Sequence, residues 1–372
     1  MKILFIISRF YPFIGGFEYH TYQLASNLVQ KGHEVTVLTT DSLVKAPKTE
    51  VINGIRIIRK KSFGMIPLTR IPISPGIYSL PKENFDIVNV FGCIPFISDL
   101  TLFFAKQKKL KTVYTHVFDP IGNEFIYKTG IYKIYNLFAK LIVKKYADSI
   151  TTLTNDYIRS SSLLNGLKNV HAIPSGVEKS FYRFSNKERI KLKKKFGNKK
   201  IILFVGRLDA YKGVKYLVDS LKYLKNDVLL LIAGEGNEKI RLEKQVLKNK
   251  LENVRFLGII NRKKLLELYN TADIFVLPAI TKQEVFGKVN IEAMACGIPV
   301  IATNLPGVRE VVKDCGLIVE PKNPTKLAEA VNKILGNRKL AEKFSKNGLK
   351  KVKDAYDWDK IAQKTMNLYK SL

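Results

Sequence analysis

The feature that most constrains the fold is an alternation of short apolar runs with longer amphipathic segments, and this alternation begins twice along the chain. The first series opens with MKILFIIS at residues 1–8, a glycine-containing loop, an amphipathic segment and HEVTVLTT at 33–40. The second opens with KIILFVG at 200–206, after a polar and basic stretch. Because strands that alternate with helices build parallel sheets, the sequence predicts an α/β protein with two Rossmann-like domains facing a central cleft.

The length of the chain supports this division. A chain of 372 residues is too long for one ordinary hydrophobic core, so two domains are expected. We place the first domain at residues 1–178 and the second at 179–355, followed by a final helical segment at 356–372. A hydrophobic content of 46% excludes a disordered chain.

The formal net charge of +31 is the most unusual property of the composition. It favours polyanionic partners, such as nucleic acid, an anionic membrane face or phosphorylated substrates. Lysine abundance that reflects genome composition or thermal adaptation explains the same number, and the sequence leaves both explanations open. The three scattered cysteines, Cys93, Cys296 and Cys315, argue against a disulfide framework, show no metal-binding spacing and fit a reducing compartment.

Two observations bear on the membrane. The apolar start of the chain is too short for a signal peptide and fits a first buried strand, and no stretch approaches 18 uninterrupted apolar residues. In the helical pattern at 125–146, however, Lys133, Lys140 and Lys144 fall on one face. This face would dock on anionic lipid headgroups, although an ordinary solvated surface helix explains it equally well. We therefore expect a cytoplasmic protein with a peripheral contact to the inner face of the membrane.

Residues 279–308 form the stretch with the most chemical content. Glu284 lies in a loop, Gly287 follows it, and a helix predicted at 289–296 carries Glu292. The free N–H groups at a helix start bind anions, and a glycine lets a ligand approach the backbone closely. Two carboxylates beside such a site can accept hydrogen bonds from hydroxyl groups, which predicts a phosphorylated polyol as ligand. The alternative is that both glutamates are solvated surface residues.

Three other places carry candidate site residues. Gly15 and Gly16 lie between the first predicted strand and its helix, where α/β folds bind ligands. His116 ends a predicted strand, although lone histidines are more often structural. Arg207 and Lys212 share one strand-to-helix loop and form a second candidate phosphate site, but two basic residues mean little alone in so basic a chain.

Several sequence blocks, in order, give these candidates a common meaning. They are P-x-x-G-G-x-E and G-H-x-V at the front, I-P-S-G-V-E before the basic stretch, V-G-R-L-D-x-Y-K-G, A-G-E-G, F-L-G, A-D-I-F-V-L-P, Glu-x7-Glu with F-G, E-A-M-A-C-G-I-P-V-I-A-T, and P-G-V-R-E-V-V. With these blocks the chain resembles the retaining GT-B glycosyltransferases of family 4 over nearly its whole length. The resemblance implies a GT-B fold whose C-terminal helix returns to the N-terminal domain.

The resemblance also implies roles for individual residues. Gly15 and Gly16 would face the donor phosphates and the acceptor, and His116 would contact the transferred sugar near its reacting carbon. Arg207 and Lys212 would hold the diphosphate and stabilise the charge that builds on it as it leaves. The remaining positions would bind the donor: Glu284 the sugar hydroxyls, the backbone at Phe286, Gly287, Lys288 and Val289 the same site, Glu292 the ribose, and the backbone at Gly258 and Ile259 the base.

Two positions depart from the family pattern. Family members usually have an aliphatic residue after F-G, where this chain has Lys288, and usually have Gly-Gly near Pro306-Gly307. A backbone-only role at Lys288 makes the first departure harmless, whereas a side-chain role adds a charge near the diphosphate.

The activity implied is transfer of a sugar from a UDP- or GDP-linked donor to an acceptor hydroxyl with retention of the anomeric configuration. The departing phosphate would help to deprotonate the acceptor. We expect no cofactor and no metal ion, since side-chain cations meet the diphosphate. The first domain would bind the acceptor, a glycan or lipid-linked precursor of a polysaccharide or glycolipid, and the second domain the nucleotide sugar.

Three other functions are compatible with parts of the sequence. A nucleotide-sugar 2-epimerase shares the fold, but the Glu-x7-Glu block with E-A-M-A-C-G favours the transferase. A nucleic-acid-binding protein would account for the charge, yet no binding motif is recognisable and the aromatic residues sit in apolar patterns, so no nucleic acid is expected. A non-catalytic nucleotide-sugar-binding protein remains open.

Overall fold

The structure is a computed structural model that describes residues 1–13, 15–42, 45–66, 71–92, 97–119, 131–181, 184–197, 199–225 and 227–372. The chain divides into two compact units. Unit 1 comprises Met1–Ser175 and Trp358–Leu372, and unit 2 comprises Gly176–Asp357. The boundaries predicted after residues 178 and 355 lie close to these limits.

Unit 1 is built on an eight-stranded sheet in the order β10-β9-β8-β7-β1-β2-β4-β3. All neighbouring strands pair in parallel except β3 and β4, which are antiparallel. The strands are β1 (Lys2–Ile6), β2 (Glu34–Thr40), β3 (Thr49–Ile52), β4 (Ile55–Lys60), β7 (Ile87–Gly92), β8 (Thr112–His116), β9 (Ser149–Thr152) and β10 (Val170–Ala172), with a separate pair β5 (Met65–Ile66) and β6 (Ile71–Pro72).

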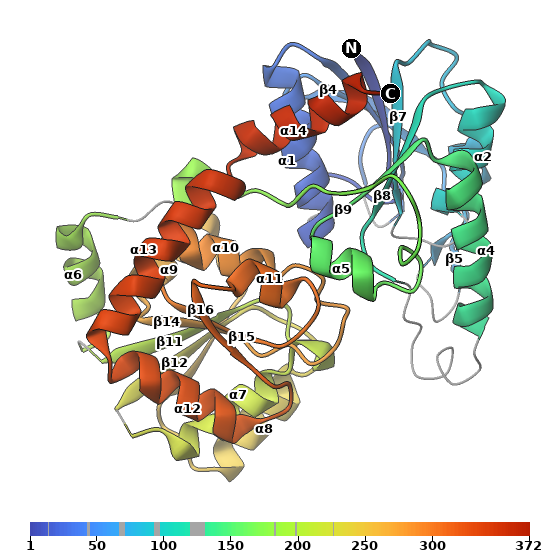
Figure 1. Ribbon diagram of the computed structural model, residues 1–372. Coiled ribbons are helices and arrows are strands. Elements are labelled where there is room, and N and C mark those ends of the chain that lie inside the picture. The colour runs from blue at the N-terminus through green and yellow to red at the C-terminus, as the bar shows by residue number, and fades with distance from the viewer. Residues whose placement is uncertain are drawn as a thin grey trace. The chain divides into compact units, whose positions relative to one another are not determined.

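Helices cover both faces of this sheet. They are α1 (Gly16–Gln30), η1 (Pro75–Tyr78), α2 (Ile97–Gln107), α4 (Ile131–Tyr146), α5 (Asn155–Ser160) and α14 (Trp358–Lys370). Helices α1 and α14 lie side by side on one face, and α2 and α4 lie on the other (Figure 1). Helix α1 buries Leu24, Ala25 and Leu28, as its periodicity predicts, whereas Val29, which the periodicity places on the same face, is only partly buried. Gly32 follows the helix with φ of +83°.

The C-terminal helix belongs to unit 1. Trp358, Ile361 and Tyr369 of α14 are buried in the same core as the residues of β1 and α1. The Asn89 amide of β7 donates a hydrogen bond of 2.7 Å to the Tyr369 hydroxyl. The prediction that the final helix returns to the N-terminal domain is therefore confirmed.

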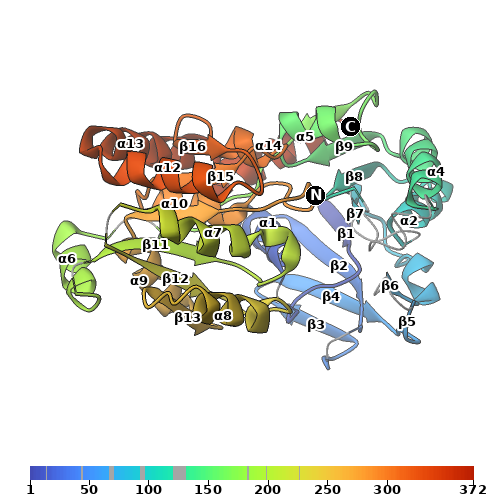
Figure 2. The same ribbon diagram turned by 90° about the horizontal axis from the view of Figure 1, so that it is seen from below.

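Unit 2 contains a six-stranded parallel sheet in the order β13-β12-β11-β14-β15-β16. Its strands are β11 (Lys200–Val205), β12 (Val228–Ala233), β13 (Val254–Gly258), β14 (Ile274–Leu277), β15 (Val300–Thr303) and β16 (Gly316–Val319). Its helices are η2 (Lys179–Phe181), α6 (Asn186–Lys194), η3 (Ala210–Lys212), α7 (Val214–Ser220), η4 (Leu221–Tyr223), α8 (Lys239–Lys248), α9 (Arg262–Thr271), α10 (Lys288–Ala295), α11 (Val308–Val312), α12 (Pro324–Leu335) and α13 (Arg338–Ala355). Helix α7 packs between α8 and α12 (Figure 2), and α10 packs against α13.

The strand order of unit 2 is the doubly wound one, with three strands extending from β11 to one side and three from β14 to the other. The basic stretch that precedes it forms α6, whose Ser185 and Glu188 make a reciprocal capping box. Helix α10 begins at Lys288, one residue before its predicted start. Strand β3 and helix α2 were not predicted, and residues 125–130 of the predicted helix at 125–146 lie outside the described residues. No helix in the described part of the chain is long and apolar enough to cross a bilayer.

Candidate functional site

The candidate donor site of unit 2 lies where the strand order reverses. Strands β11 and β14 are neighbours although residues 206–273 lie between them in the chain. Each of the two strands ends in a loop that carries charged residues. In open parallel sheets ligands bind outside the carboxyl ends of the strands at this reversal. The topology alone therefore places the loop after β11 and the loop after β14 at a ligand-binding edge.

Close backbone packing brings these two loops together. Gly213 has φ of +66°, and a Cβ at this position would lie 2.1 Å from the carbonyl oxygen of Pro278. The N–H of Ile280 donates to the carbonyl oxygen of Tyr211 over 2.8 Å. Only glycine allows the end of η3 to approach β14 in this way. The preceding residue, Lys212, is thus carried to the loop of Glu284.

Lys212 and Glu284 form an ion pair in which each side chain is 12% exposed. The second carboxylate oxygen of Glu284 accepts a hydrogen bond of 3.1 Å from the N–H of Gly287. Burial disfavours the charged lysine, but the carboxylate of Glu284 outweighs it and raises the pKa of Lys212. The edge of the sheet therefore holds a permanent cation beside a carboxylate, and Glu284 is not the solvated surface residue of the alternative interpretation.

Arg207 stands on the same loop as Lys212 and is far more open. Its side chain is 70% exposed and forms an ion pair of 3.0 Å with Asp209. It also lies 3.5 Å from the hydroxyl of Tyr211. The carboxylate of Glu284 raises the pKa of Lys212 and the positive charge of Arg207 opposes it, so the two cations predicted to hold a diphosphate act on each other electrostatically.

The turn before α10 requires glycine at position 287. Gly287 has φ of +70°, and a Cβ there would lie 2.6 Å from the Asn290 amide nitrogen and 2.8 Å from Leu277. The helix that follows starts at Lys288, and Phe286 is buried against the ring of Tyr356. The predicted glycine turn at a helix start is therefore present, but Gly287 itself is buried and its N–H donates to Glu284 in this structure.

Glu292 on α10 is buried, with 7% of its surface exposed. It accepts a hydrogen bond of 2.9 Å from the hydroxyl of Tyr269 and pairs with Lys288 at 3.5 Å. Burial lowers the pKa of Lys288, since the attraction of Glu292 does not compensate for it. The solvated-surface interpretation is wrong for Glu292 as well, and Tyr269 is a partner that the sequence did not reveal.

Asn290 is a further residue that the sequence analysis missed. It is fully buried in the first turn of α10, and neither its amide nitrogen nor its amide oxygen has a hydrogen-bond partner among the described residues. Buried polar groups are nearly always hydrogen-bonded in native proteins. An amide without a partner, next to Gly287, is therefore a candidate contact for a bound ligand.

The remaining predicted donor-binding positions of unit 2, Gly258, Ile259 and Val289, carry no charged side chain. Gly258 ends β13 with φ of +64°, and its carbonyl oxygen accepts from the N–H of Gly234 over 2.9 Å. Ile259, the next residue, is 85% exposed. Val289 contributes its carbonyl oxygen, 3.5 Å from the hydroxyl of Tyr269. These groups present backbone atoms and one apolar side chain, but no cation or carboxylate.

In unit 1, Gly15 caps the start of α1 and Gly16 is its first residue. A Cβ at Gly15 would lie 2.1 Å from a carboxylate oxygen of Glu18. The Glu18 side chain therefore folds back over the N-terminus of its own helix, where a negative charge is stabilised. A donor phosphate at this position would meet that carboxylate, which the predicted role of the Gly15-Gly16 loop did not foresee.

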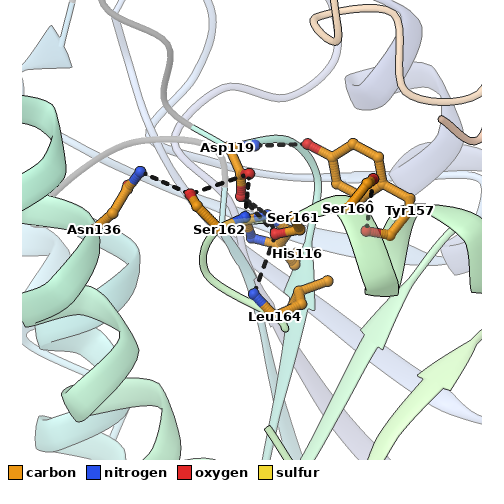
Figure 3. A network of polar contacts seen from close by, with 8 residues as sticks. All are labelled: His116, Asp119, Asn136, Tyr157, Ser160, Ser161, Ser162 and Leu164. Atoms are coloured by element: carbon orange, nitrogen blue, oxygen red, sulfur yellow. Dashed lines mark hydrogen bonds and ion pairs between the residues drawn. The ribbon is translucent and has the colours of Figure 1, made fainter. Parts of the chain in front are cut away.

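His116 is enclosed at the end of β8, where it is 1% exposed. Its Nε2 atom lies 3.0 Å from Asp119, which also accepts hydrogen bonds from the Ser161 hydroxyl at 2.6 Å and from the Ser162 N–H at 2.7 Å. Figure 3 shows Asp119 at the centre of these contacts. The Tyr157 ring stacks on the imidazole, with 6.1 Å between centroids.

This network fixes the charge of Asp119 and the orientation of the His116 ring. Burial alone would raise the pKa of Asp119, but hydrogen bonds from His116, Ser161 and Ser162 outweigh it and lower the pKa to about 2. Asp119 is therefore ionised near neutral pH, and Nε2 of His116 is a donor to it. The Nδ1 atom is buried and has no hydrogen-bond partner among the described residues. The spacing His-x-x-Asp after a strand is the one sequence signal that could have identified Asp119.

No cluster of three or more His, Cys, Asp or Glu side chains suited to a metal occurs among the described residues. The chain contains one Asp-x-Asp sequence, Asp357-Trp358-Asp359, in which Asp359 pairs with Lys31 at 3.8 Å. Cys296 and Cys315 are buried free thiols whose pKa values burial raises. Cys93 lies outside the described residues.

Comparison with known proteins covers nearly the whole chain. The family model described as Glycosyltransferase Family 4 matches residues 14–181, and that described as Glycosyl transferases group 1 matches residues 185–351. An uncharacterized glycosyltransferase of Methanocaldococcus jannaschii is 28% identical, with 100% of this chain and 98% of that protein covered. The phosphatidyl-myo-inositol mannosyltransferase of Mycobacterium leprae is 27% identical, with coverage of 100% and 97%.

Two solved structures resemble this chain in fold over its whole length. Sucrose-phosphate synthase from Thermosynechococcus elongatus superposes with a TM-score of 0.80 at 24% identity, covering 100% of this chain and 98% of that one. The HepE protein of Anabaena, in complex with UDP-glucose, superposes with a TM-score of 0.79 at 20% identity and full coverage of both chains. These structures show that the chain has the GT-B fold, and the two family models show that it belongs to the family 4 glycosyltransferases.

Proposed function

We propose that this glycosyltransferase moves a sugar from a nucleotide diphosphate sugar to an acceptor hydroxyl and retains the anomeric configuration. The observation that carries the proposal is the Lys212–Glu284 pair, with Arg207 beside it, at the reversal point of the unit 2 sheet. A diphosphate is the ligand whose charge matches two adjacent cations, and hydroxyl groups are the ligands that match a carboxylate.

The charges of the site explain how a donor would be accommodated. Lys212 is neutralised by Glu284 and Arg207 by Asp209, so both cations have carboxylate partners. An arriving diphosphate would take hydrogen bonds from Lys212 and Arg207, and Glu284 would then accept from the hydroxyls of the sugar. Asn290, with its unsatisfied buried amide, would add one hydrogen bond to the donor.

In the reaction, the bond between the anomeric carbon and the diphosphate oxygen breaks, and a bond from the acceptor oxygen to that carbon forms on the same face. The acceptor proton passes to the departing phosphate. Lys212 remains protonated because Glu284 raises its pKa, and it stabilises the charge that accumulates on the leaving group. No metal ion is needed for this stabilisation, so activity in EDTA is expected to equal activity without it.

The acceptor we propose is lipid-linked, a precursor of a glycolipid or polysaccharide. One support is the relative in Mycobacterium leprae, which is named for transfer of mannose to phosphatidyl-myo-inositol. The other is the net charge of +31, which favours an anionic membrane surface on which such acceptors reside. We assign acceptor binding to unit 1 and a peripheral cytoplasmic location to the protein.

A thermal-shift panel of UDP-, GDP- and ADP-linked sugars tests the donor. A true donor at one hundred times its dissociation constant should stabilise the protein by about 2.7 kcal/mol. The stabilising donor is then incubated with a polyprenyl-linked acceptor, and NMR of the product reports the anomeric configuration. An inverted product would refute retention, and stabilisation without transfer to any acceptor would favour a non-catalytic binding protein.

A further inference from the structure

Helix α4 exposes apolar side chains in a way that the rest of unit 1 does not require. Ile134, Leu137, Phe138 and Leu141 are 73%, 62%, 42% and 59% exposed, and their spacing places them on one face of the helix. We call these four residues the α4 stripe. Scattered exposed apolar residues are ordinary, but a contiguous apolar stripe on a helix usually marks a binding surface.

The opposite face of α4 holds the helix in place. Ala139 and Val143 are fully buried, and the helix packs against α2. The Asn136 amide donates to the Ser162 hydroxyl over 3.1 Å, and the Tyr135 hydroxyl donates to Asp99. Figures 1 and 2 both show α4 at the outer edge of unit 1. The stripe is therefore surplus to the packing of unit 1 and faces away from its sheet.

The charge along α4 indicates the chemistry of the partner. The helix carries Lys133, Lys140, Lys144 and Lys145 and contains no Asp or Glu. Lys133, Lys144 and Lys145 are exposed, whereas the Lys140 ammonium donates to the carbonyl oxygen of Asn165. Lysines that flank an apolar face, with no carboxylate among them, match a surface that is anionic outside and apolar beneath.

Helix α8 of unit 2 provides an internal comparison. It also exposes an isoleucine and a leucine, Ile240 at 66% and Leu247 at 76%. Among the described residues no other exposed large apolar residue is found between these two, however, and the two basic residues beside Ile240 pair with carboxylates, in Lys239–Glu235 and Arg241–Glu238. Exposure of single aliphatic residues thus occurs on both helices, whereas α4 differs from α8 in having four exposed apolar residues on one face and no Asp or Glu of its own.

We propose that the α4 stripe inserts into the headgroup region of an anionic lipid bilayer, with the flanking lysines contacting lipid phosphates. The helix would lie in the plane of the membrane, as amphipathic interfacial helices do. This proposal deepens the peripheral location proposed above, but it does not depend on the transfer reaction, since it concerns binding to lipid alone.

The test is co-sedimentation of the full-length protein with vesicles of equimolar phosphatidylglycerol and phosphatidylcholine at low salt. The Ile134→Ser/Leu141→Ser variant should reduce the partition coefficient about tenfold, because two large aliphatic side chains no longer insert. The matched control is Ile240→Ser/Leu247→Ser, which removes the same residue types at similar exposure from α8 and should bind as the wild type does.

A second variant isolates the charge. Lys133→Gln/Lys144→Gln should weaken binding to the same vesicles by about fivefold for each lysine, and roughly 0.5 M salt should remove most of that difference. Its control is Lys244→Gln/Lys248→Gln on α8, whose lysines are also exposed. Vesicles of phosphatidylcholine alone should bind the wild type far more weakly.

The proposal is overturned if the wild type does not sediment with anionic vesicles, or if the α8 control weakens binding as much as the α4 variant. It is also overturned if the α4 variant changes the oligomeric state in sedimentation velocity without changing vesicle binding, because the stripe would then be an interface between copies of this chain. Donor stabilisation in the thermal-shift panel is independent of all these outcomes, so failure here leaves the proposed transfer reaction untouched.

Discussion

The two candidate sites lie at the carboxyl edges of two parallel sheets, yet they are built in opposite ways. In unit 2, opposite charges from two separate loops meet as Lys212 and Glu284, and Arg207 beside them is largely exposed. In unit 1, a single histidine is enclosed by Asp119, its hydrogen-bond partners and a tyrosine ring. The difference suggests two tasks: unit 2 can exchange a carboxylate for another anion, whereas unit 1 holds one imidazole in a fixed orientation.

The largest effect is expected from Lys212→Ala. Loss of a group that stabilises the leaving diphosphate should reduce kcat about 100- to 1,000-fold, or about 2.7–4 kcal/mol. Lys215→Ala, which removes an exposed lysine on the next turn, should retain wild-type kcat. Steady-state kinetics with the identified donor measures both.

Lys212→Ala also leaves the Glu284 carboxylate without its cation, which destabilises a buried site. The double variant Lys212→Ala/Glu284→Gln removes that unpaired charge and should recover thermal stability but not activity. If the double variant regains turnover, Lys212 serves the fold and not the reaction, and the contrast between the units is lost.

The next effect, on unit 1, is expected from Asp119→Asn. The pKa of Asp119 is lowered from its ordinary 3.8 to about 2, so the folded state favours the ionised carboxylate by about 2 kcal/mol. Because the folded pKa lies below the unfolded one, this contribution is complete above about pH 4 and is lost as the pH falls through about 2. The variant should therefore be less stable than the wild type at pH 7, and the gap should shrink at pH 3.

Urea unfolding at the two pH values measures this gap. Asp227→Asn is the control, because Asp227 is 71% exposed and pairs only at the surface with Lys199 at 3.1 Å. If the difference in free energy of unfolding between the wild type and Asp119→Asn is the same at pH 3 and pH 7, Asp119 stabilises the fold by packing and hydrogen bonding and not by its charge.

A smaller effect is expected from Asn290→Leu, which should stabilise the fold but weaken donor binding. Removal of a buried amide that has no partner should raise the melting temperature by about 2–4 °C, while loss of one hydrogen bond to the donor should weaken donor binding by up to about tenfold. Asn270 is the matched control. It is also fully buried, but its amide donates to the Leu266 carbonyl and accepts from the Phe184 N–H, so Asn270→Leu should lower stability. Equal destabilisation by both substitutions would show that Asn290 has partners the free protein already supplies.

The sequence predicted unit 2 better than unit 1, and the reason is physical. Gly213 and Gly287 adopt positive φ values that favour glycine. The turns that position Lys212 and Glu284 can therefore be recognised in the sequence by their glycines. Asp119 has only the weak signal of the His-x-x-Asp spacing and Ser161 has none, because polar residues in loops are common whether or not they orient a histidine. Tyr269 was hidden for a similar reason, since an aromatic residue in an amphipathic helix normally indicates only a buried face.

The exposed α4 stripe shows a second limit of prediction from sequence. Periodicity identifies that a helix has an apolar face but not whether a neighbour covers it. The structure shows that the face formed by Ala139 and Val143 is buried, while Ile134 and Leu141 remain in solvent. Burial is decided by how many apolar faces the sheet can cover, which is a property of the tertiary arrangement and not of the helix.

The smallest effect is expected at Lys288, where the charge resembles that of Lys212 but the surroundings differ. Both lysines are largely buried beside a glutamate, yet the pKa of Lys212 is raised and that of Lys288 is lowered by burial, since Glu292 lies 3.5 Å away and already accepts from Tyr269. Replacement of a poorly compensated buried ion by an apolar side chain is often neutral or stabilising. Lys288→Leu should therefore leave the melting temperature unchanged or slightly higher, and should change the KM for the donor by less than about threefold, within the range of one weak contact. A rise in KM of tenfold or more, suppressed by high salt, would instead assign Lys288 to the diphosphate. The site of unit 2 would then bind its ligand through three cations, Arg207, Lys212 and Lys288. The difference in positive charge between this site and the histidine site of unit 1 would be larger than the Lys212–Glu284 pair alone indicates.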